Sequence, residues 1–295
     1  MEYPDQRIIQ TDVGVFHLKI TEHINRITNT IESYFIGLGS KNNKCVQISF
    51  PSRKSLIKDG TLAWVSAMDD CSLEKYIQKG LAHHMVLLGL TIARNINPTL
   101  EKIVLDDMSA FKCDLPDNKS YKVDMKPFHI AFHGATWYEY YFDAKLENND
   151  ERKIYNRLKA NLYNSNKKPP TFIFNNSELQ KELEPLYQKS QTWAQFFELI
   201  GAKYGKKKCG VVYPWLIHAM KIIFDKTQLY ERYYWVIDIR NNNAKTKTPL
   251  IPFRSYEYKP SVEASKKHKC YFEKHYYMID IPEVMSMNYT QFLQN

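Results

Sequence analysis

The sequence predicts an α/β fold, with a mixed sheet and flanking helices followed by a mainly helical C-terminal region. Two observations support this prediction. Strand-like and helix-like segments alternate through the first 150 residues, which is typical of sheets connected by crossover helices. After residue 170, apolar residues recur at helical spacing in three successive segments. With 295 residues, of which 44% are hydrophobic, the chain can fill one large core or two modest ones.

Alternating apolar residues predict the strands of the first half. We expect strands over residues 13–20, 45–50, 62–67 and 102–106. Residues 23–35 instead place Ile24, Ile27, Ile31 and Tyr34 on one face at helical spacing. That spacing predicts an amphipathic helix.

An apolar helix is expected over residues 82–95. Asn97-Pro98 should end it, because a residue before proline disfavours the helical conformation. Residues 115–126 are polar and rich in turn formers, which predicts a loop. Residues 135–146 are expected to form another helix.

The polar, Asn-rich residues 145–170 are the best candidate for a domain boundary. We therefore expect an α/β domain over residues 1–150 and a mainly helical domain with a few strands over residues 171–295. The second domain should contain helices over 177–186, 192–204 and 209–224, with Pro214 near the first turn of the last, and strands over 233–239 and 276–279. The aromatic residues expected to pack this region onto the first domain are Trp193, Phe196, Phe197, Trp215 and Trp235.

The chain is basic, with a formal net charge of +9. This charge favours anionic partners such as nucleic acid, a coenzyme phosphate or an acidic surface. The lysines and arginines are spread along the chain, so a solvated basic surface without a partner explains the charge equally well.

The cysteines suggest a reducing compartment. The five residues, Cys45, Cys71, Cys113, Cys209 and Cys270, are odd in number, scattered and without a CxxC motif. No secretory signal is visible at the N-terminus, so we expect free thiols in an intracellular protein. The longest apolar run, residues 85–93, is too short to span a bilayer, and we expect a soluble protein with no membrane partner.

A small-residue turn precedes the helix expected at residue 82. Backbone N–H groups at a helix start are unpaired and lie at the positive end of the helix dipole, so they can bind a pyrophosphate. The candidate coenzyme-binding residues are Gln78, Lys79, Gly80, Leu81 and Ala82. A Gly-x-Ala turn before an apolar helix is also common in proteins without this function.

The order of a strand, this turn, a helix, a second strand and the aromatic run from Tyr138 to Phe142 resembles the acyl-CoA N-acetyltransferase (GNAT) family. The resemblance implies a GNAT-like sheet with acetyl-CoA as cofactor. It also implies that Tyr138 is the acid that protonates the departing thiolate, while Glu139 is the best candidate for the general base. Two positions depart from the family pattern: Ile77 stands where Arg or Gln is usual, and no glycine precedes Phe142. A packed aromatic role for Tyr138 remains the alternative.

Three short motifs in the sequence show a more specific resemblance. They consist of Ile103, Leu105, Asp107, Ser109 and Cys113; of Gly134, Thr136, Trp137, Tyr138, Glu139 and Phe142; and of Lys207, Lys208, Cys209, Tyr213, Pro214, Trp215 and Leu216. This combination resembles uncharacterised acetyltransferase-like proteins of large DNA viruses. It implies a location in the virion or in a viral factory of the host cytoplasm, with nucleic acid or other viral proteins as partners, and it implies no activity.

Two basic clusters are candidates for nucleic-acid binding. Their residues are Lys203, Lys206, Lys207, Lys208, Lys266, Lys267 and Lys269. Aromatic residues that could stack on bases lie among them, namely Tyr204, Tyr213, Trp215 and Tyr271. The alternative is a solvated basic face beside aromatic core residues.

No metal site is expected. His129-x-x-x-His133 would align on one helix face, but the sequence offers no obvious third ligand. Asp106, Asp107 and Ser109 follow a predicted strand, where a carboxylate could bind a metal or take a proton. Capping of the next turn is the favoured role for these residues.

Two functions therefore remain open from the sequence. The favoured one is a divergent, non-catalytic acetyltransferase-like protein with a basic surface. The alternative is an active acyl-CoA-dependent N-acetyltransferase that uses the Gly80 turn, Tyr138 and Glu139.

Overall fold

A computed structural model describes most of the chain. The described residues are 5–11, 14–39, 44–65, 82–107, 109–114, 120–164, 177–224, 234–240, 254–257 and 276–277. The chain divides into two compact units, which we call unit 1 (Met1–Leu105 with Ile237–Asn295) and unit 2 (Asp106–Val236). These divisions fall after Leu105 and after Val236, whereas the sequence suggested a boundary between residues 150 and 171.

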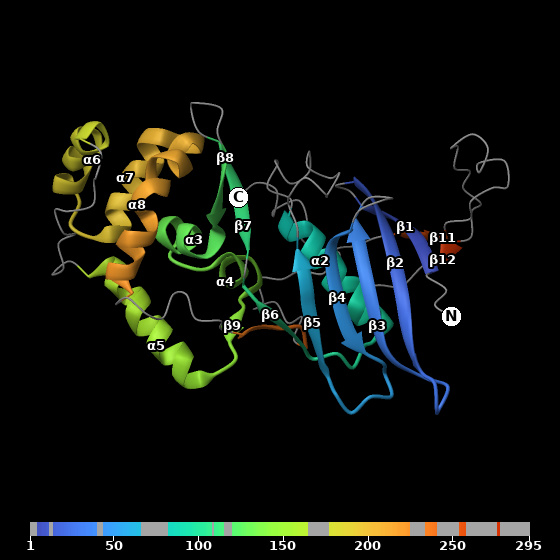
Figure 1. The fold of residues 1–295 in the computed structure, drawn as a ribbon. Coiled ribbons are helices and arrows are strands. Elements are labelled where there is room, and N and C mark those ends of the chain that lie inside the picture. The colour runs from blue at the N-terminus through green and yellow to red at the C-terminus, as the bar shows by residue number, and fades with distance from the viewer. Residues whose placement is uncertain are drawn as a thin grey trace, which may run out of the picture. The chain divides into compact units, whose positions relative to one another are not determined.

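Unit 1 is built on a mixed β-sheet (Figure 1). Its strands are β1 (Asp5–Thr11), β2 (Gly14–Asn25), β3 (Thr30–Gly39), β4 (Lys44–Pro51), β5 (Asp59–Val65), β6 (Lys102–Asp106), β10 (Tyr234–Asp238), β11 (Arg254–Glu257) and β12 (Tyr276–Tyr277). The strand order is β12-β11-β1-β2-β3-β4-β5-β6, followed by β10 and then β9 (Lys145–Leu146). Strands β1 to β5 pair with their sequence neighbours in antiparallel fashion, while β5 and β6 are parallel.

The predicted strands of the first half are confirmed, but the helix predicted over residues 23–35 is wrong. That stretch is the end of β2, a turn and the start of β3, with Asn25 opposite Thr30. Asn29 adopts a left-handed conformation (φ 52°), which asparagine tolerates and which helps to close the turn. The run of β-branched Ile and Thr residues favours strands, and this preference prevails over the accidental helical spacing.

Helix α2 (Ala82–Ile96) covers one face of this sheet. It confirms the apolar helix that the sequence predicts over residues 82–95. A Cβ at Gly89 would lie 3.0 Å from the Ile48 side chain, so helix and strand approach closely at this glycine. The helix ends before Asn97-Pro98, and the Asn97 side chain donates a hydrogen bond to the Pro51 carbonyl (2.8 Å). The apolar face of the sheet and most of α2 are thereby buried.

The connection β5–α2–β6 joins two parallel strands, as a crossover helix usually does. Only Asp59, Gly60 and Thr61 of β5 pair with β6, opposite Lys102, Ile103 and Val104. The last residues of β5, Leu62–Val65, have no registered partner in β6 among the described pairs. The two strands are thus paired at one end alone.

Unit 2 is mainly helical. It contains the hairpin β7 (Ala110–Asp114) and β8 (Ser120–Asp124), then α3 (Met125–His133), α4 (Trp137–Phe142), β9, α5 (Asn149–Lys159), η1 (Ala160–Tyr163), α6 (Ser177–Lys189), α7 (Trp193–Tyr204), η2 (Gly205–Lys207) and α8 (Lys208–Ile223). The first half of β10 belongs here, and its Trp235 and Val236 pair with β9. The helices predicted over 177–186, 192–204 and 209–224 are confirmed, but Pro214 lies in the interior of α8.

Two predictions for unit 2 were wrong. A loop was predicted over residues 115–126, but residues 120–126 form a strand and the start of a helix, while residues 115–119 lie outside the described residues. The helix expected over 135–146 is confined to α4, because Asp143 adopts a left-handed conformation (φ 50°) that ends it. Within residues 145–170, the candidate domain boundary, the chain forms helix α5, which buries Tyr155.

The large aromatic residues of the second half form the core of unit 2. The Phe197 and Trp215 rings stack with centroids 5.9 Å apart, and Phe196 lies 5.8 Å from Trp215. Trp235 contacts Tyr155 edge to face at 5.4 Å. These residues therefore pack within the helical unit itself. No helix within the described ranges is both long and apolar enough to cross a membrane.

Candidate functional site

The predicted coenzyme turn lies almost entirely outside the described residues. Gln78, Lys79, Gly80 and Leu81 are not described, and Ala82 is the first residue of α2. Beside it, the His83 and His84 rings lie 4.1 Å apart. Burial, together with His83, lowers the pKa of His84 to about 4, so its imidazole is neutral at pH 7.

The predicted general base, Glu139, has both carboxylate oxygens engaged inside unit 2. It completes a capping box with Thr136 at the start of α4, in which the Thr136 N–H donates to the carboxylate at 3.2 Å. The Tyr155 hydroxyl donates to the same oxygen at 2.9 Å, and Lys159 forms an ion pair with the other oxygen. A carboxylate with these three donors is held in place, and taking a substrate proton would require breaking these contacts.

The predicted acid, Tyr138, is buried on α4. Its ring packs edge to face on Trp137 at 4.9 Å and lies 6.1 Å from Phe142. Burial, and to a lesser extent Asp107, raises the pKa of Tyr138 well above its usual value. A phenol with a raised pKa gives up its proton less readily, so this site is unfavourable for acid catalysis.

Asp107 has the capping role expected from the sequence. Its Oδ1 accepts hydrogen bonds from the hydroxyl and the backbone N–H of Ser109, two residues further along the chain. Its Oδ2 is buried and has no hydrogen-bond partner among the described residues. Burial raises the pKa of Asp107, although the hydrogen bonds from Ser109 partly oppose this.

His129 and His133 do align on one face of α3, with ring centroids 4.3 Å apart. The Nδ1 of His129 lies 2.8 Å from the Ala135 carbonyl, to which it must donate, since a carbonyl only accepts. Burial lowers the pKa of both histidines, that of His133 to about 4. Within the described ranges, no group of three or more His, Cys, Asp or Glu side chains could hold a metal ion.

The prediction of free thiols is wrong for at least three cysteines. Cys113 of β7 and Cys209 of α8 form a disulfide with a Cα–Cα distance of 6.0 Å, and Cys45 is also disulfide-bonded. The pair is 96 residues apart in the sequence, and folding brings β7 against the start of α8. Cys209 therefore presents no thiol, despite the basic residues that precede it.

Of the predicted nucleic-acid-binding lysines, three are exposed together. Lys203, Lys206 and Lys207 lie where α7 passes through η2 into α8. Lys208 instead turns inward, with its ammonium 4.5 Å from the Phe132 ring centroid, and desolvation lowers its pKa. The other three predicted lysines, Lys266, Lys267 and Lys269, lie outside the described residues.

The aromatic residues beside these lysines are largely committed to the core. Trp215 is buried, and its Nε1–H donates to the Val211 carbonyl at 3.0 Å. Tyr204 is half-buried, and its hydroxyl donates to Glu182 at 2.6 Å. The surface therefore offers phosphate-binding cations more than base-stacking rings.

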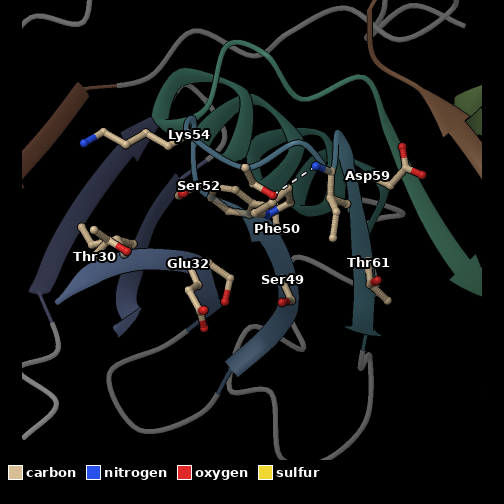
Figure 2. A pocket seen from close by; sticks show the side chains of 13 residues that line it. Thr30, Glu32, Ser49, Phe50, Ser52, Lys54, Asp59 and Thr61 are labelled. Carbon is tan, nitrogen blue, oxygen red and sulfur yellow. Dashed lines mark hydrogen bonds between the residues drawn. The ribbon is translucent and has the colours of Figure 1, made fainter. Parts of the chain in front are cut away.

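A hollow of about 570 Å³ lies in unit 1 at one end of β3, β4 and β5, on the face of the sheet opposite α2 (Figure 2). Ser33, Ser49 and Thr61 contribute hydroxyl groups from the three strands, and Lys54 and Glu32 contribute charges. The helical spacing of residues 23–35 hides this site in the sequence, because a helix there would remove part of β3. The alternation of polar and apolar residues in β4 was the signal that could have revealed it.

No protein-family model, curated protein or solved structure matches this chain.

Proposed function

We propose that this chain is an acetyltransferase-like protein that does not transfer acyl groups and that binds nucleic acid through the exposed lysines of unit 2. The observation that carries the proposal is the engagement of Glu139 by Thr136, Tyr155 and Lys159. The best candidate for the general base thereby serves the stability of unit 2. Its neighbour Tyr138 is a core residue with a raised pKa.

The sheet supports the acetyltransferase-like part of the proposal. Antiparallel strands β1 to β5 lead through α2 into β6, which is parallel to β5. Three residue pairs join β5 and β6. Strands that separate after a short paired segment are what the GNAT resemblance implies around a coenzyme.

The partner is inferred from charge. Lys203, Lys206 and Lys207 are exposed on one junction, and the chain carries a net charge of +9. Lysines bind phosphates without reading base sequence, so the expected binding is non-specific and depends on salt. Such a protein would fit the virion or replication site of a large DNA virus, as the sequence resemblance implies.

Binding to a double-stranded DNA fragment at several salt concentrations tests the nucleic-acid function. Replacing Lys203, Lys206 and Lys207 by alanine should weaken binding and reduce the slope of log K against log salt by about 2 to 3, because each phosphate contact contributes about 0.9. Replacing Lys145, Lys181 and Lys189, which are also exposed in unit 2, removes the same charge elsewhere and serves as the control. Equal losses in both triple variants would contradict a local site.

An active acyltransferase remains the second candidate, because the pairs between β5 and β6 stop at Thr61 and Val104, and parallel strands that pair over a short segment are what the GNAT resemblance implies around a coenzyme. Calorimetry with acetyl-CoA separates the two candidates. A Kd below about 100 μM, equivalent to about 5.5 kcal/mol, would contradict a chain that has lost its cofactor. Absence of binding at millimolar acetyl-CoA would exclude the enzyme.

A further inference from the structure

Two loops of unit 1 lie at the same end of the sheet. We call them the hairpin tip, residues 26–29 between β2 and β3, and the connecting tip, residues 52–58 between β4 and β5. The register places them together, since Asn25 pairs with Thr30, Ser33 with Pro51, and Ser49 with Thr61. Figure 1 shows both loops beyond the same ends of β2 to β5.

Both tips expose large aliphatic side chains. Ile27 is 95% exposed and Leu56 is 97% exposed, while their neighbours Ile24 and Ile57 are 49% and 64% exposed. A single exposed aliphatic residue needs no explanation, but three on two adjacent loops, with Ile24 near the end of β2 beside them, make an apolar surface. Ile24 and Ile27 are two of the residues whose spacing predicts a helix over residues 23–35.

The hairpin tip has an ordered backbone. The Asn25 side chain accepts hydrogen bonds from the N–H groups of Ile27 (2.8 Å) and Thr28 (3.2 Å). The Asn29 N–H closes the turn onto the Asn25 carbonyl at 2.8 Å. Because these polar groups are satisfied locally, Ile27 is held outward by a defined turn.

The connecting tip is fastened to the end of α2. The Arg53 guanidinium donates to the Ile96 carbonyl at 2.7 Å and to the Asn95 carbonyl at 3.3 Å. Lys58 contacts Thr99 at 3.3 Å, and the Glu101 N–H donates to the Lys58 carbonyl at 2.9 Å. The loop that presents Leu56 and Ile57 is therefore anchored on both sides.

The charges around the tips are mainly positive. Arg26 precedes Ile27, and Arg53, Lys54 and Lys58 surround Leu56 and Ile57, with no acidic residue within 52–58. The nearby carboxylate of Asp59 is paired with Lys102 at 3.2 Å. Aliphatic side chains bracketed by cations match the interface of a bilayer, where apolar groups enter the headgroup–acyl boundary and cations meet acidic lipids.

We propose that unit 1 docks on the surface of a membrane containing anionic lipids, with Ile27, Leu56 and Ile57 entering the interface. The hollow of Figure 2 borders both tips, since Thr30, Ile31, Lys54 and Ile57 line it. Besides Lys54, its lining holds two carboxylates. Glu32 accepts a hydrogen bond from the Asn25 side chain at 2.6 Å, and Asp59 is paired with Lys102. The attachment is peripheral, and it is independent of the nucleic-acid surface on unit 2.

Sedimentation of the full chain with vesicles tests this proposal. Vesicles of phosphatidylcholine with 30% phosphatidylserine should bind the protein, and vesicles of phosphatidylcholine alone should bind it more weakly. Ile27→Asp and Leu56→Asp should each weaken binding at least about tenfold, because each removes an aliphatic side chain from the interface. Lys54→Ala should weaken binding about fivefold, and this loss should shrink at high salt.

Ile222→Asp, which introduces the same charge at another exposed isoleucine, is the matched control and should bind like the wild type. Circular dichroism should confirm that each variant is folded. Absence of vesicle binding would overturn the proposal, and so would tip variants that bind vesicles as well as the wild type does. Loss of binding in the Lys203/Lys206/Lys207 variant alone would overturn it too. A dimer that dissociates on Leu56→Asp would identify a second copy of the chain as the occupant and would also overturn it.

Discussion

At the residue scale, Glu139 shows how a side chain suited to chemistry can serve folding instead. Its carboxylate caps α4 through Thr136 and connects that helix to Tyr155 and Lys159 on α5. The side chains of Glu139 and Lys159 are each about one-fifth exposed, so water screens the ion pair little. The residue therefore links two elements of unit 2.

Glu139→Gln should lower stability, since the neutral amide accepts less strongly from Lys159 and from the cap. We expect a loss of about 1–2 kcal/mol in the free energy of unfolding, from the weakened cap and the unpaired Lys159. Urea denaturation followed by circular dichroism measures this loss. Glu198→Gln, at an exposed position of α7, is the control. If Glu139→Gln is as stable as the wild type, the carboxylate does not serve stability. A catalytic role for Glu139 would then be supported again.

His133 makes stability depend on pH. Burial, His129 and Lys208 lower its pKa from 6.5 to about 4, and Tyr140 of α4 lies 5.5 Å from its ring. Between pH 6.5 and pH 4 the unfolded chain therefore takes up a proton that the folded chain does not. Stability should fall as the pH falls through this range.

His133→Gln should flatten this slope when thermal unfolding is followed from pH 7 to pH 4. Part of the slope should remain, because the pKa of His84 is also lowered to about 4. If His133→Gln leaves the slope unchanged, this imidazole takes up its proton over the same pH range in the folded and the unfolded chain. That result would contradict a lowered pKa.

At the element scale, the disulfide joins the β7–β8 hairpin to α8. The linked residues, Cys113 and Cys209, are 96 positions apart, so the bond closes a long loop. Between them the chain forms α3 to α7, and Lys208 packs on Phe132 of α3 beside the bond. The link thus restrains the unfolded chain across most of unit 2.

The double variant Cys113→Ala/Cys209→Ala should be less stable than the wild type by about 2–4 kcal/mol, because its unfolded chain regains the freedom that the bond removes. Urea denaturation of both proteins under oxidising conditions measures the difference. Peptide mapping without reduction should recover the two cysteines in one linked peptide pair. Recovery of both as alkylated free thiols would contradict the bond.

At the scale of the whole molecule, the chain leaves unit 1 after Leu105 and returns to it at Ile237. Unit 2 is therefore a continuous segment with its own aromatic core, its own disulfide and its own sheet pairing between β9 and β10. Unit 1 is completed by strands from both ends of the sequence.

A fragment of residues 106–236 should fold by itself, since every contact just named lies within it. Cooperative thermal unfolding and a dispersed amide spectrum would show this. Trp215→Ala within the same fragment should abolish cooperativity, because it removes a large ring from the core. A fragment that is unfolded while the full chain is folded would mean that unit 2 depends on unit 1.

Local sequence patterns predict correctly those elements whose local signals agree with their burial. The apolar helix α2 and its end at Asn97-Pro98, the buried strand β6, and helices α6 to α8 are all readable from spacing, proline and hydrophobicity. The capping role of Asp107 was also readable, because an aspartate two residues before a serine favours a local turn.

Other features depend on contacts between segments that are distant in the sequence. Ile24 and Ile27 satisfy a helical pattern, but the pairing of β2 with β3 places Ile24 near the end of a strand and Ile27 in an exposed turn. Tyr138 and Glu139 look catalytic in sequence, and it is partners 16 and 20 residues away, Tyr155 and Lys159, that engage the Glu139 carboxylate. Cys113 and Cys209 look unrelated until β7 packs against α8. Local pattern fixes what one segment prefers, whereas burial, ion pairing and disulfide formation depend on residues that only folding brings together.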